Sequence, residues 1–267
     1  MKGIIKMSKQ KIIYYTDELN NDFANNKIKT QKLNENYKYE NNNVFFKFFS
    51  FMFRYIVAVP ILWFINVVIL RVKIKNKKLL KKLKNKGYFI YANHVVPLDP
   101  VIIPVMTHPG KFTLITSSHD TFSIHPIVSF LVKSLGAIPV PSTIKMYDNY
   151  VKCMSNNIKK KKRVLIYPEA HIWPYYNKIR NFKASSFRYP VDEGAAIVVM
   201  TTTFKKSKIF KKPSIEIYID GPFYPNLDIC RNEAVNELRD IAFLTMSKRA
   251  NSLSNYEYIK YIKVEKS

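Results

Sequence analysis

The feature that most constrains this chain is an apolar and aromatic stretch from Val44 to Leu70, in which Lys47 and Arg54 are the only charges. Its uncharged part, residues 55–70, has 16 residues, whereas a straight transmembrane helix needs ~20. Pro60 lies within it. We therefore expect a helix that bends at Pro60 and lies at a membrane interface or dips into one leaflet. A buried core helix is the alternative that these residues leave open.

The residues that follow the apolar stretch favour a membrane-associated helix over a buried core helix. Nine basic side chains follow within residues 71–86, namely Arg71, Lys73, Lys75, Lys77, Lys78, Lys81, Lys82, Lys84 and Lys86. An apolar segment that meets a polybasic one is typical of contact with an anionic cytoplasmic leaflet, where each cation contributes ~1 kcal/mol. A core helix needs no such flank, so we predict association with the cytoplasmic face of the cell membrane.

The charge of the whole chain points to anionic partners. Lys and Arg number 44 against 19 Asp and Glu, which gives a net charge of +25 and predicts attraction to anionic lipid, nucleic acid or phosphorylated substrates. No nucleic-acid recognition motif is visible, so nucleic acid is not expected as a partner, although a non-catalytic basic protein that binds lipid or nucleic acid remains the alternative function. Two cysteines, Cys153 and Cys230, exclude a disulfide framework, and no His/Cys spacing predicts a metal site.

Composition divides the chain into four parts. Residues 1–43 are polar and rich in Asn and Lys, which predicts a flexible arm. The membrane-associated segment and its polybasic collar span residues 44–86. Residues 87–230 are predicted to form an α/β domain, and residues 231–267 a C-terminal helical region.

Short apolar runs alternate with helical stretches after residue 87. The candidate strands are Tyr88–Ala92, Phe112–Thr116, Ala137–Val140, Val164–Tyr167, Ala196–Thr201 and Ser214–Ile219. Such strands are covered on both faces, so the pattern predicts the α/β class, with a mixed central sheet flanked by helices. A helix is predicted over residues 143–158, where apolar side chains recur at spacings of three and four on one face: Ile144, Tyr147, Val151, Met154 and Ile158.

One loop carries candidate catalytic residues. His94 and Asp99 follow the strand Tyr88–Ala92, and Pro97 between them favours a loop that folds the carboxylate back onto the imidazole. Asp99 before Pro100 also has the pattern of a helix N-cap. A neutral histidine can take a proton from an alcohol near pH 7, and a carboxylate on its other nitrogen fixes the tautomer and stabilises the imidazolium.

Three stretches resemble one family in its own order. Asn93-His94 with Asp99 resembles the N-H-x4-D signature of the glycerophosphate and lysophosphatidate acyltransferases, residues 136–141 (GAIPVP) are similar to its second block, and residues 166–171 (IYPEAH) to its third. Phe182-Lys183 resembles the Phe-Lys pair that follows. The resemblance implies the α/β sandwich of these enzymes.

The resemblance also implies a reaction. An acyl group would pass from acyl-CoA, acyl carrier protein or acyl phosphate to a lysophosphatidate-like hydroxyl, without a cofactor beyond that co-substrate. His94 would be the general base and Asp99 its partner. The resemblance places four further residues at the substrate: Asn93, Gly136, Pro168 and Glu169.

The chain departs from the family at the positions that hold the acceptor phosphate. Where the third block continues Gly-Thr-Arg, this chain has Ala170, His171 and Ile172, and the second block lacks its closing arginine. We expect Lys183 and Arg188 to face the polar head instead. His171, close to Trp173, is expected to pack against aromatic rings, with phosphate binding or a role as base as the alternatives.

Overall fold

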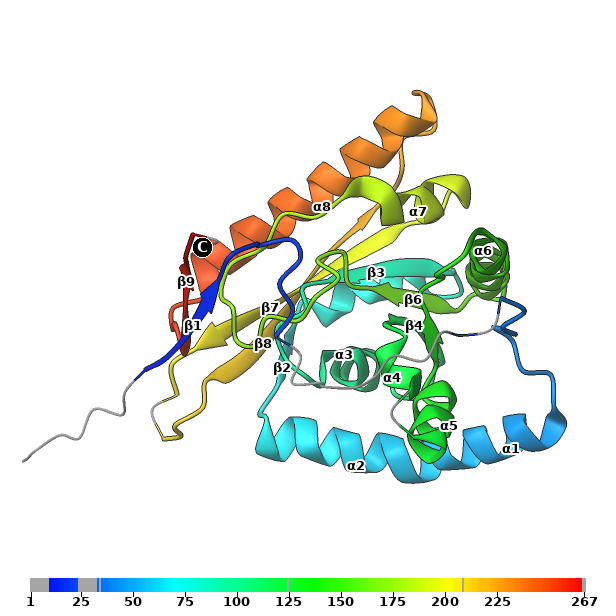
Figure 1. The fold of residues 1–267 in the computed structure, drawn as a ribbon, viewed down its shortest axis with the longest axis horizontal. Coiled ribbons are helices and arrows are strands. Elements are labelled where there is room, and N and C mark those ends of the chain that lie inside the picture. Colours follow the sequence, from blue (N-terminus) through cyan, green and yellow to red (C-terminus); the bar gives the residue numbers. More distant parts are fainter. Residues whose placement is uncertain (1–9, 24–32, 34, 124, 208, 266–267) are drawn as a thin grey trace, which may run out of the picture.

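A seven-stranded sheet organises the molecule (Figure 1). The structure, a computed structural model, describes residues 10–23, 33, 35–123, 125–207 and 209–265. In spatial order the strands are β2 Lys73–Lys75, β8 Ser214–Phe223, β7 Ile197–Lys205, β3 Tyr88–Ala92, β6 Arg163–Ile166, β4 Thr113–Ser117 and β5 Ala137–Pro139. Neighbours pair in parallel except β7 with β8. The mixed sheet predicted from the sequence is confirmed, and all six candidate strands form within it.

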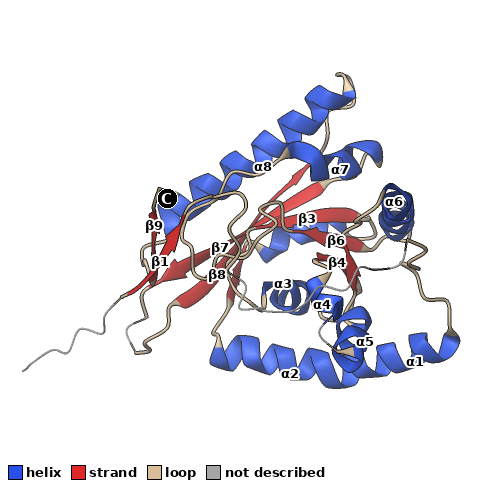
Figure 2. Cartoon of the chain, in the orientation of Figure 1, coloured by secondary structure: helices blue, strands red, loops and turns tan. Residues whose placement is uncertain are grey.

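Helices cover both faces of this sheet (Figure 2). They are α3 Asp99–Thr107, α4 Asp120–Ser123, α5 Pro126–Ser134, α6 Ile144–Lys159, α7 Arg188–Asp192 and α8 Arg231–Leu253, with 3-10 turns η3 Lys77–Leu83 and η4 Ala184–Phe187. Side chains alternate along β3, so Phe89 and Tyr91 join the core under α6 and α8, while Ile90 and Ala92 join the core under α3. The sheet is therefore buried on both sides, as its continuous apolar strands require.

The apolar stretch forms one helix of 26 residues, Val44–Ile69, which runs through α1 Val44–Met52, η1 Phe53–Ala58, α2 Val59–Phe64 and η2 Ile65–Ile69. The helix continues through Pro60, the residue at which the sequence predicts a bend. The turn before Pro60 is π-helical, with the Val59 N–H bonded to the Arg54 carbonyl, and a wider turn gives the proline ring room. Among the described residues this is the one helix long and apolar enough to cross a membrane.

This helix lies along the body rather than projecting from it (Figure 1). It contacts α3 and α5, where Ser50 Oγ is 3.0 Å from Ser134 Oγ and Arg54 donates to the Ser134 carbonyl. The opposite side is apolar and exposed, including Phe48, Ile61 and Val68 at 54–57% exposure. The alternative of a buried core helix is thus excluded, because most of its apolar surface is not covered by this chain.

The predicted face of helix 143–158 is wrong in part. α6 occupies the expected residues, but Ile144 is 87% exposed, and the buried stripe contains Met146 and Tyr150 as well as Met154. The spacing identified the helix, yet the buried stripe is rotated towards Met146, where α6 packs on both β6 and α7.

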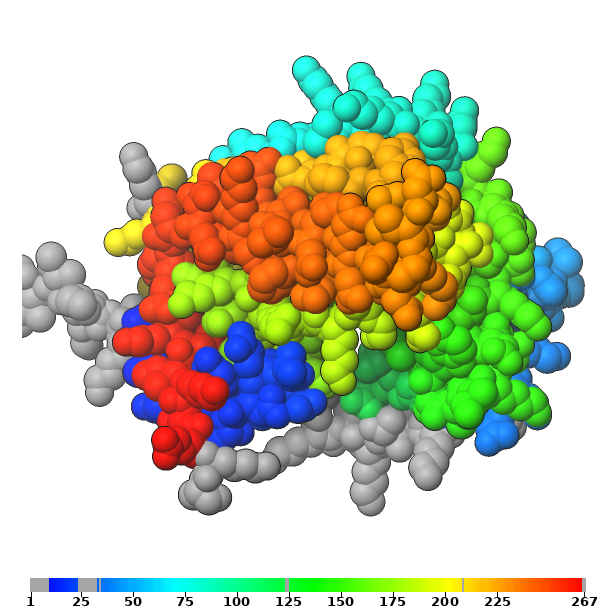
Figure 3. Space-filling view, turned by 90° about the horizontal axis from the view of Figure 1, so that it is seen from above, coloured from blue at the N-terminus to red at the C-terminus, as the bar shows by residue number. Residues whose placement is uncertain are grey.

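Two predicted boundaries also shift. β2 lies inside the polybasic collar and pairs with β8, so the sheet already begins at Lys73. β1 Lys11–Tyr15, in the arm predicted to be flexible, pairs in parallel with β9 Ile259–Lys263 in the C-terminal region. Figure 3 shows the two ends of the chain lying against each other beside α8. Residues 1–9, 24–32 and 34 of that arm lie outside the described residues.

Candidate active site

The loop between β3 and α3 brings His94 and Asp99 together. Asp99 is fully buried, and its Oδ2 accepts the N–H groups of Val95 at 2.8 Å and Val96 at 2.6 Å. His94 Nδ1 lies 3.6 Å from the same oxygen. Two backbone donors thus fix the carboxylate, and the imidazole lies just beyond hydrogen-bond distance from it.

The expected N-cap role of Asp99 is wrong. Asp99 is the first residue of α3, and its carboxylate turns back to the loop instead of accepting the N–H groups of the helix. The reason is local, because the N–H groups of Val95 and Val96, in the turn that contains Pro97, take the carboxylate as their acceptor. The carboxylate therefore closes the loop that carries His94.

The His94 ring is held from one side and open on the other. It stacks on Tyr167, with ring centroids 4.5 Å apart, and its side chain keeps 17% exposure. The His94 carbonyl accepts the Trp173 N–H at 3.1 Å, which ties the backbone to the neighbouring loop. Because Nδ1 faces Asp99, the other ring nitrogen, Nε2, is the one available to a substrate.

Glu169 lies on the turn after β6, next to His94 because β3 and β6 are adjacent parallel strands whose carboxyl ends meet. Its buried carboxylate accepts the His94 N–H at 3.2 Å and the Arg180 N–H at 2.9 Å. The Arg180 guanidinium lies 3.6 Å away. Burial raises the pKa of Glu169, and Arg180 opposes that rise. Glu169 thus connects the two loops at the site.

Ala170 adopts a backbone conformation that favours glycine. Its φ is 63°. Ala170 stands where the third block of the glycerophosphate and lysophosphatidate acyltransferases, which this stretch resembles, has Gly. An L-residue in this region costs ~1–2 kcal/mol. The turn keeps its shape in spite of the substitution, which indicates that surrounding contacts hold it.

Arg180 supplies many of those contacts. It is 1% exposed, and its guanidinium donates to the carbonyls of Glu169 at 3.3 Å, Glu18 at 3.2 Å and His171. These bonds commit the Arg180 guanidinium to the loop. A buried arginine has no periodic signal in the sequence, so only the fold reveals this role.

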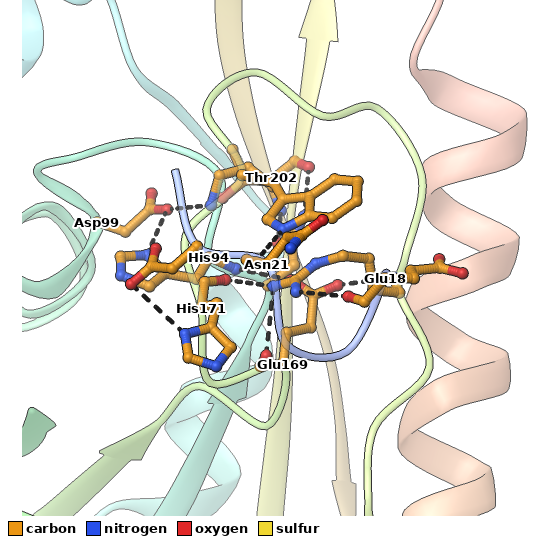
Figure 4. A network of polar contacts seen from close by, with 12 residues as sticks. Glu18, Asn21, His94, Asp99, Glu169, His171 and Thr202 are labelled. Atoms are coloured by element: carbon orange, nitrogen blue, oxygen red, sulfur yellow. Dashed lines mark hydrogen bonds and ion pairs between the residues drawn. The ribbon is translucent and has the colours of Figure 1, made fainter. Parts of the chain in front are cut away.

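A segment of the N-terminal arm, residues 16–23, packs over the same turn and was not anticipated. The Trp173 Nε1–H donates to the Asn21 carbonyl at 2.8 Å, and the Phe23 N–H donates to the Ile172 carbonyl at 3.2 Å. Figure 4 shows Glu18 and Asn21 beside Glu169 within one polar network. We call residues 16–23 the strap.

His171 does not pack against aromatic rings as expected. Its side chain is 36% exposed, and Nδ1 lies 3.4 Å from Asp22 Oδ2 of the strap. Figure 4 places His171 on the same side of the network as His94. His171 thus faces the strap carboxylate, whereas Ile172 and Trp173 are buried.

A cleft of about 1450 Å³ opens at these residues. His94, Pro168, Glu169 and His171 line it, together with Lys183. Another part of its wall is apolar and comes from α3, β4 and α5: Leu98, Val101, Ile115, Val132 and Leu135. The helices α3 and α5, which contribute to this wall, rest on the Val44–Ile69 helix.

Three predicted substrate residues do not line the cleft. Asn93 is buried and exchanges hydrogen bonds with the Thr202 backbone at 2.8 and 3.1 Å, which ties β3 to β7. Gly136 has φ 103°, and a Cβ there would lie 2.3 Å from the Thr113 carbonyl oxygen. Arg188 donates to the Ser185 carbonyl and lies over the Tyr147 ring. Lys183 is the one Lys or Arg in the cleft wall among the described residues.

Comparison with known proteins bears on the fold and the family of this chain. The solved structure of PlsC, the 1-acyl-sn-glycerophosphate acyltransferase of Thermotoga maritima, is similar in fold, with a TM-score of 0.54, 14% sequence identity and coverage of 80% of this chain and 88% of that chain. A comparison with curated protein sequences finds no match. The family model described as Acyltransferase matches residues 71–204, half of the sequence. The chain therefore belongs to the acyltransferase family.

Proposed function

We propose that this acyltransferase transfers a fatty acyl group to the hydroxyl of a lysophosphatidate-like glycerolipid. The observation that carries the proposal is the His94–Asp99 pair in the wall of a cleft with an apolar side. The similarity in fold to an acyltransferase that acts on 1-acyl-sn-glycerophosphate supports the choice of acceptor.

His94 acts as general base in the proposed reaction. Its Nε2 takes the proton of the acceptor hydroxyl while the oxygen attacks the carbonyl carbon of the donor. A C–O bond forms, the carbonyl becomes a tetrahedral oxyanion, and the bond to the leaving sulfur or phosphate oxygen then breaks. His94 returns its proton to the leaving group, so no proton remains on the enzyme.

Asp99 orients His94 and stabilises the imidazolium. The distance of 3.6 Å between His94 Nδ1 and Asp99 Oδ2 shortens as the imidazole gains charge, because opposite charges attract. The imidazole is the group that moves, since Val95 and Val96 hold the carboxylate in place. The proposed donor is acyl-CoA, acyl carrier protein or acyl phosphate, and no further cofactor is needed.

Lys183 is proposed to hold the acceptor phosphate. The family arginine positions are not available, since Ile172 is buried and no arginine follows residue 141 in the second block. Lys183 is the cation that reaches the cleft among the described residues, whereas Arg188 lies outside its wall. The substitution Lys183→Ala should raise acceptor KM about tenfold with little change in kcat, and Arg188→Ala is the matched control.

The acceptor and the enzyme meet at the membrane in this proposal. The exposed apolar side of Val44–Ile69 enters the lipid, and the exposed lysines of residues 73–86 bind the anionic head groups of the cytoplasmic leaflet. The apolar wall of the cleft, which borders this helix, receives the acyl chains.

The test uses purified full-length protein, a labelled acyl thioester and a panel of lysolipids in mixed micelles. We expect labelled phosphatidate from lysophosphatidate, and a loss of about 10²–10⁴-fold in kcat for His94→Ala. Normal turnover by His94→Ala would exclude the mechanism. Product with every other lysolipid but not with lysophosphatidate would exclude the acceptor.

A further inference from the structure

The turn between β7 and β8 has a sequence that its fold does not explain. Residues 205–212 read KKSKIFKK, with five lysines around two large apolar residues. Ile209 is 85% exposed and Phe210 52% exposed. Turns of soluble domains favour Gly, Pro, Asn, Asp and Ser, which serve the backbone, whereas two adjacent apolar side chains exposed at such a tip serve no turn geometry.

Hydrogen bonds and an ion pair hold the described part of this turn. The Ser207 hydroxyl accepts the N–H of Phe210 at 3.1 Å, and Lys205 pairs with Glu216 at 2.8 Å at its base. Lys206, Lys211 and Lys212 are exposed on either side of the apolar pair. An apolar tip with a basic rim matches the profile of an anionic bilayer, in which hydrocarbon lies below a layer of phosphate.

The turn also lies beside the long apolar helix. The Arg71 guanidinium, two residues beyond the end of that helix, lies 3.6 Å from the centre of the Phe210 ring. Figure 1 shows the β7–β8 turn reaching towards the edge of the molecule along which α1 and α2 run. The turn therefore lies beside the C-terminal end of the apolar helix.

We infer that the β7–β8 turn is a second membrane anchor, in which Ile209 and Phe210 enter an anionic bilayer and the flanking lysines bind lipid phosphates. With a helix alone, the domain could roll about the helix axis. A second contact at one end of the helix fixes that rotation and hence the direction in which the cleft faces. This inference rests on the proposed association of Val44–Ile69 with membranes.

The experiment measures depth directly by tryptophan quenching. The background is the full chain with Trp63→Phe, which leaves the fully buried Trp173 as a constant signal. In that background Phe210→Trp is compared with Leu244→Trp, since Leu244 is 66% exposed and α8, which carries it, runs along the opposite edge of the molecule in Figure 1. The vesicles contain phosphatidylcholine and phosphatidylglycerol, with and without bromine on the acyl chains.

We expect brominated lipid to quench the new indole of the Phe210→Trp variant about twofold or more, and to leave the fluorescence of the Leu244→Trp variant unchanged. The double substitution Ile209→Ser with Phe210→Ser should lower vesicle binding about tenfold, while Leu244→Ser should not.

Three outcomes would overturn the inference. If the Phe210→Trp variant binds vesicles but is not quenched, the turn is not inserted, although the proposed membrane association stands. Failure of the unsubstituted chain to bind vesicles overturns the inference together with that association. Binding of the turn to RNA in place of vesicles overturns it as well.

Discussion

The β3–α3 loop, which carries His94, and the turn after β6, which carries Glu169 and lies under the strap, both form part of the candidate site. They are held by different kinds of contact. In the loop, Asp99 accepts from Val95 and Val96, only four and three residues away. In the turn, Trp173 bonds Asn21 across 152 residues, and Arg180 bonds Glu18 across 162. The bonds of Asp99 are thus local, although His94 is also tied to Glu169 and Trp173, whereas the turn depends on bonds to the distant strap.

This difference separates the roles of the two regions. Changes at Asp99 should alter catalysis and leave folding nearly intact, because the hydrogen bonds of its carboxylate are local. Changes in the strapped turn should first alter stability, because each contact there closes a long loop of chain. The predictions below test this separation.

The largest effect is expected for Arg180→Met, which leaves Glu169 buried without its cation. Breaking a buried ion pair on one side costs ~3–5 kcal/mol of unfolding free energy. Urea unfolding measures it, and Arg188→Met, at a partly exposed arginine, should change stability by less than about 0.5 kcal/mol. An equal effect of the two variants would remove Arg180 from its supporting role.

The same variant should respond to pH. Burial raises the pKa of Glu169, and loss of Arg180 raises it further. The folded state of the variant then binds a proton more tightly than the unfolded state, so stability increases as the pH falls. We expect the deficit relative to the unsubstituted chain to shrink between pH 7 and pH 5, and a constant deficit would contradict this account.

A smaller effect is expected for Asp99→Asn. One oxygen, Oδ2, receives both backbone N–H groups and faces His94, and Asp99 Oδ1 has no hydrogen-bond partner within the described part of the chain. The asparagine oxygen can occupy the Oδ2 position and keep the loop closed, but the charge that stabilises the imidazolium is lost. We expect kcat to fall about 10- to 100-fold, with thermal unfolding nearly unchanged.

Asp99→Asn should therefore differ from Arg180→Met in losing activity without losing stability. If Asp99→Asn unfolds at a much lower temperature, the loop is not self-supporting and the two regions are not distinct. If kcat is unchanged, Asp99 serves the loop alone.

The smallest effect is expected for Ala170→Gly, at the junction of the two regions. Glycine adopts φ 63° without the steric cost that alanine bears, although it adds freedom to the unfolded chain. We expect the protein to gain up to about 1 kcal/mol of stability, measured by urea unfolding, with kcat unchanged. A loss of stability would show that the methyl group packs usefully in the turn.

The sequence predicts the region of local contacts well and the other poorly. Strand positions and the closeness of His94 to Asp99 follow from short-range pattern and from motifs a few residues long. The strap, the role of Arg180 and the pairing of β1 with β9 do not, since Lys11–Tyr15 is too short and too isolated to signal a strand before its partner is known. The π-helical turn before Pro60 is likewise not visible in hydrophobic spacing.

The parallel pairing of β1 with β9 has a consequence for synthesis. Tyr261 of β9 supports the turn after β6. Its ring stacks on Trp173, and its hydroxyl donates to the Pro174 carbonyl at 2.8 Å. A ribosome must therefore add Ile259–Lys263 before the first strand finds its partner. Until then only the strap and Arg180 hold the turn, without the support of Tyr261.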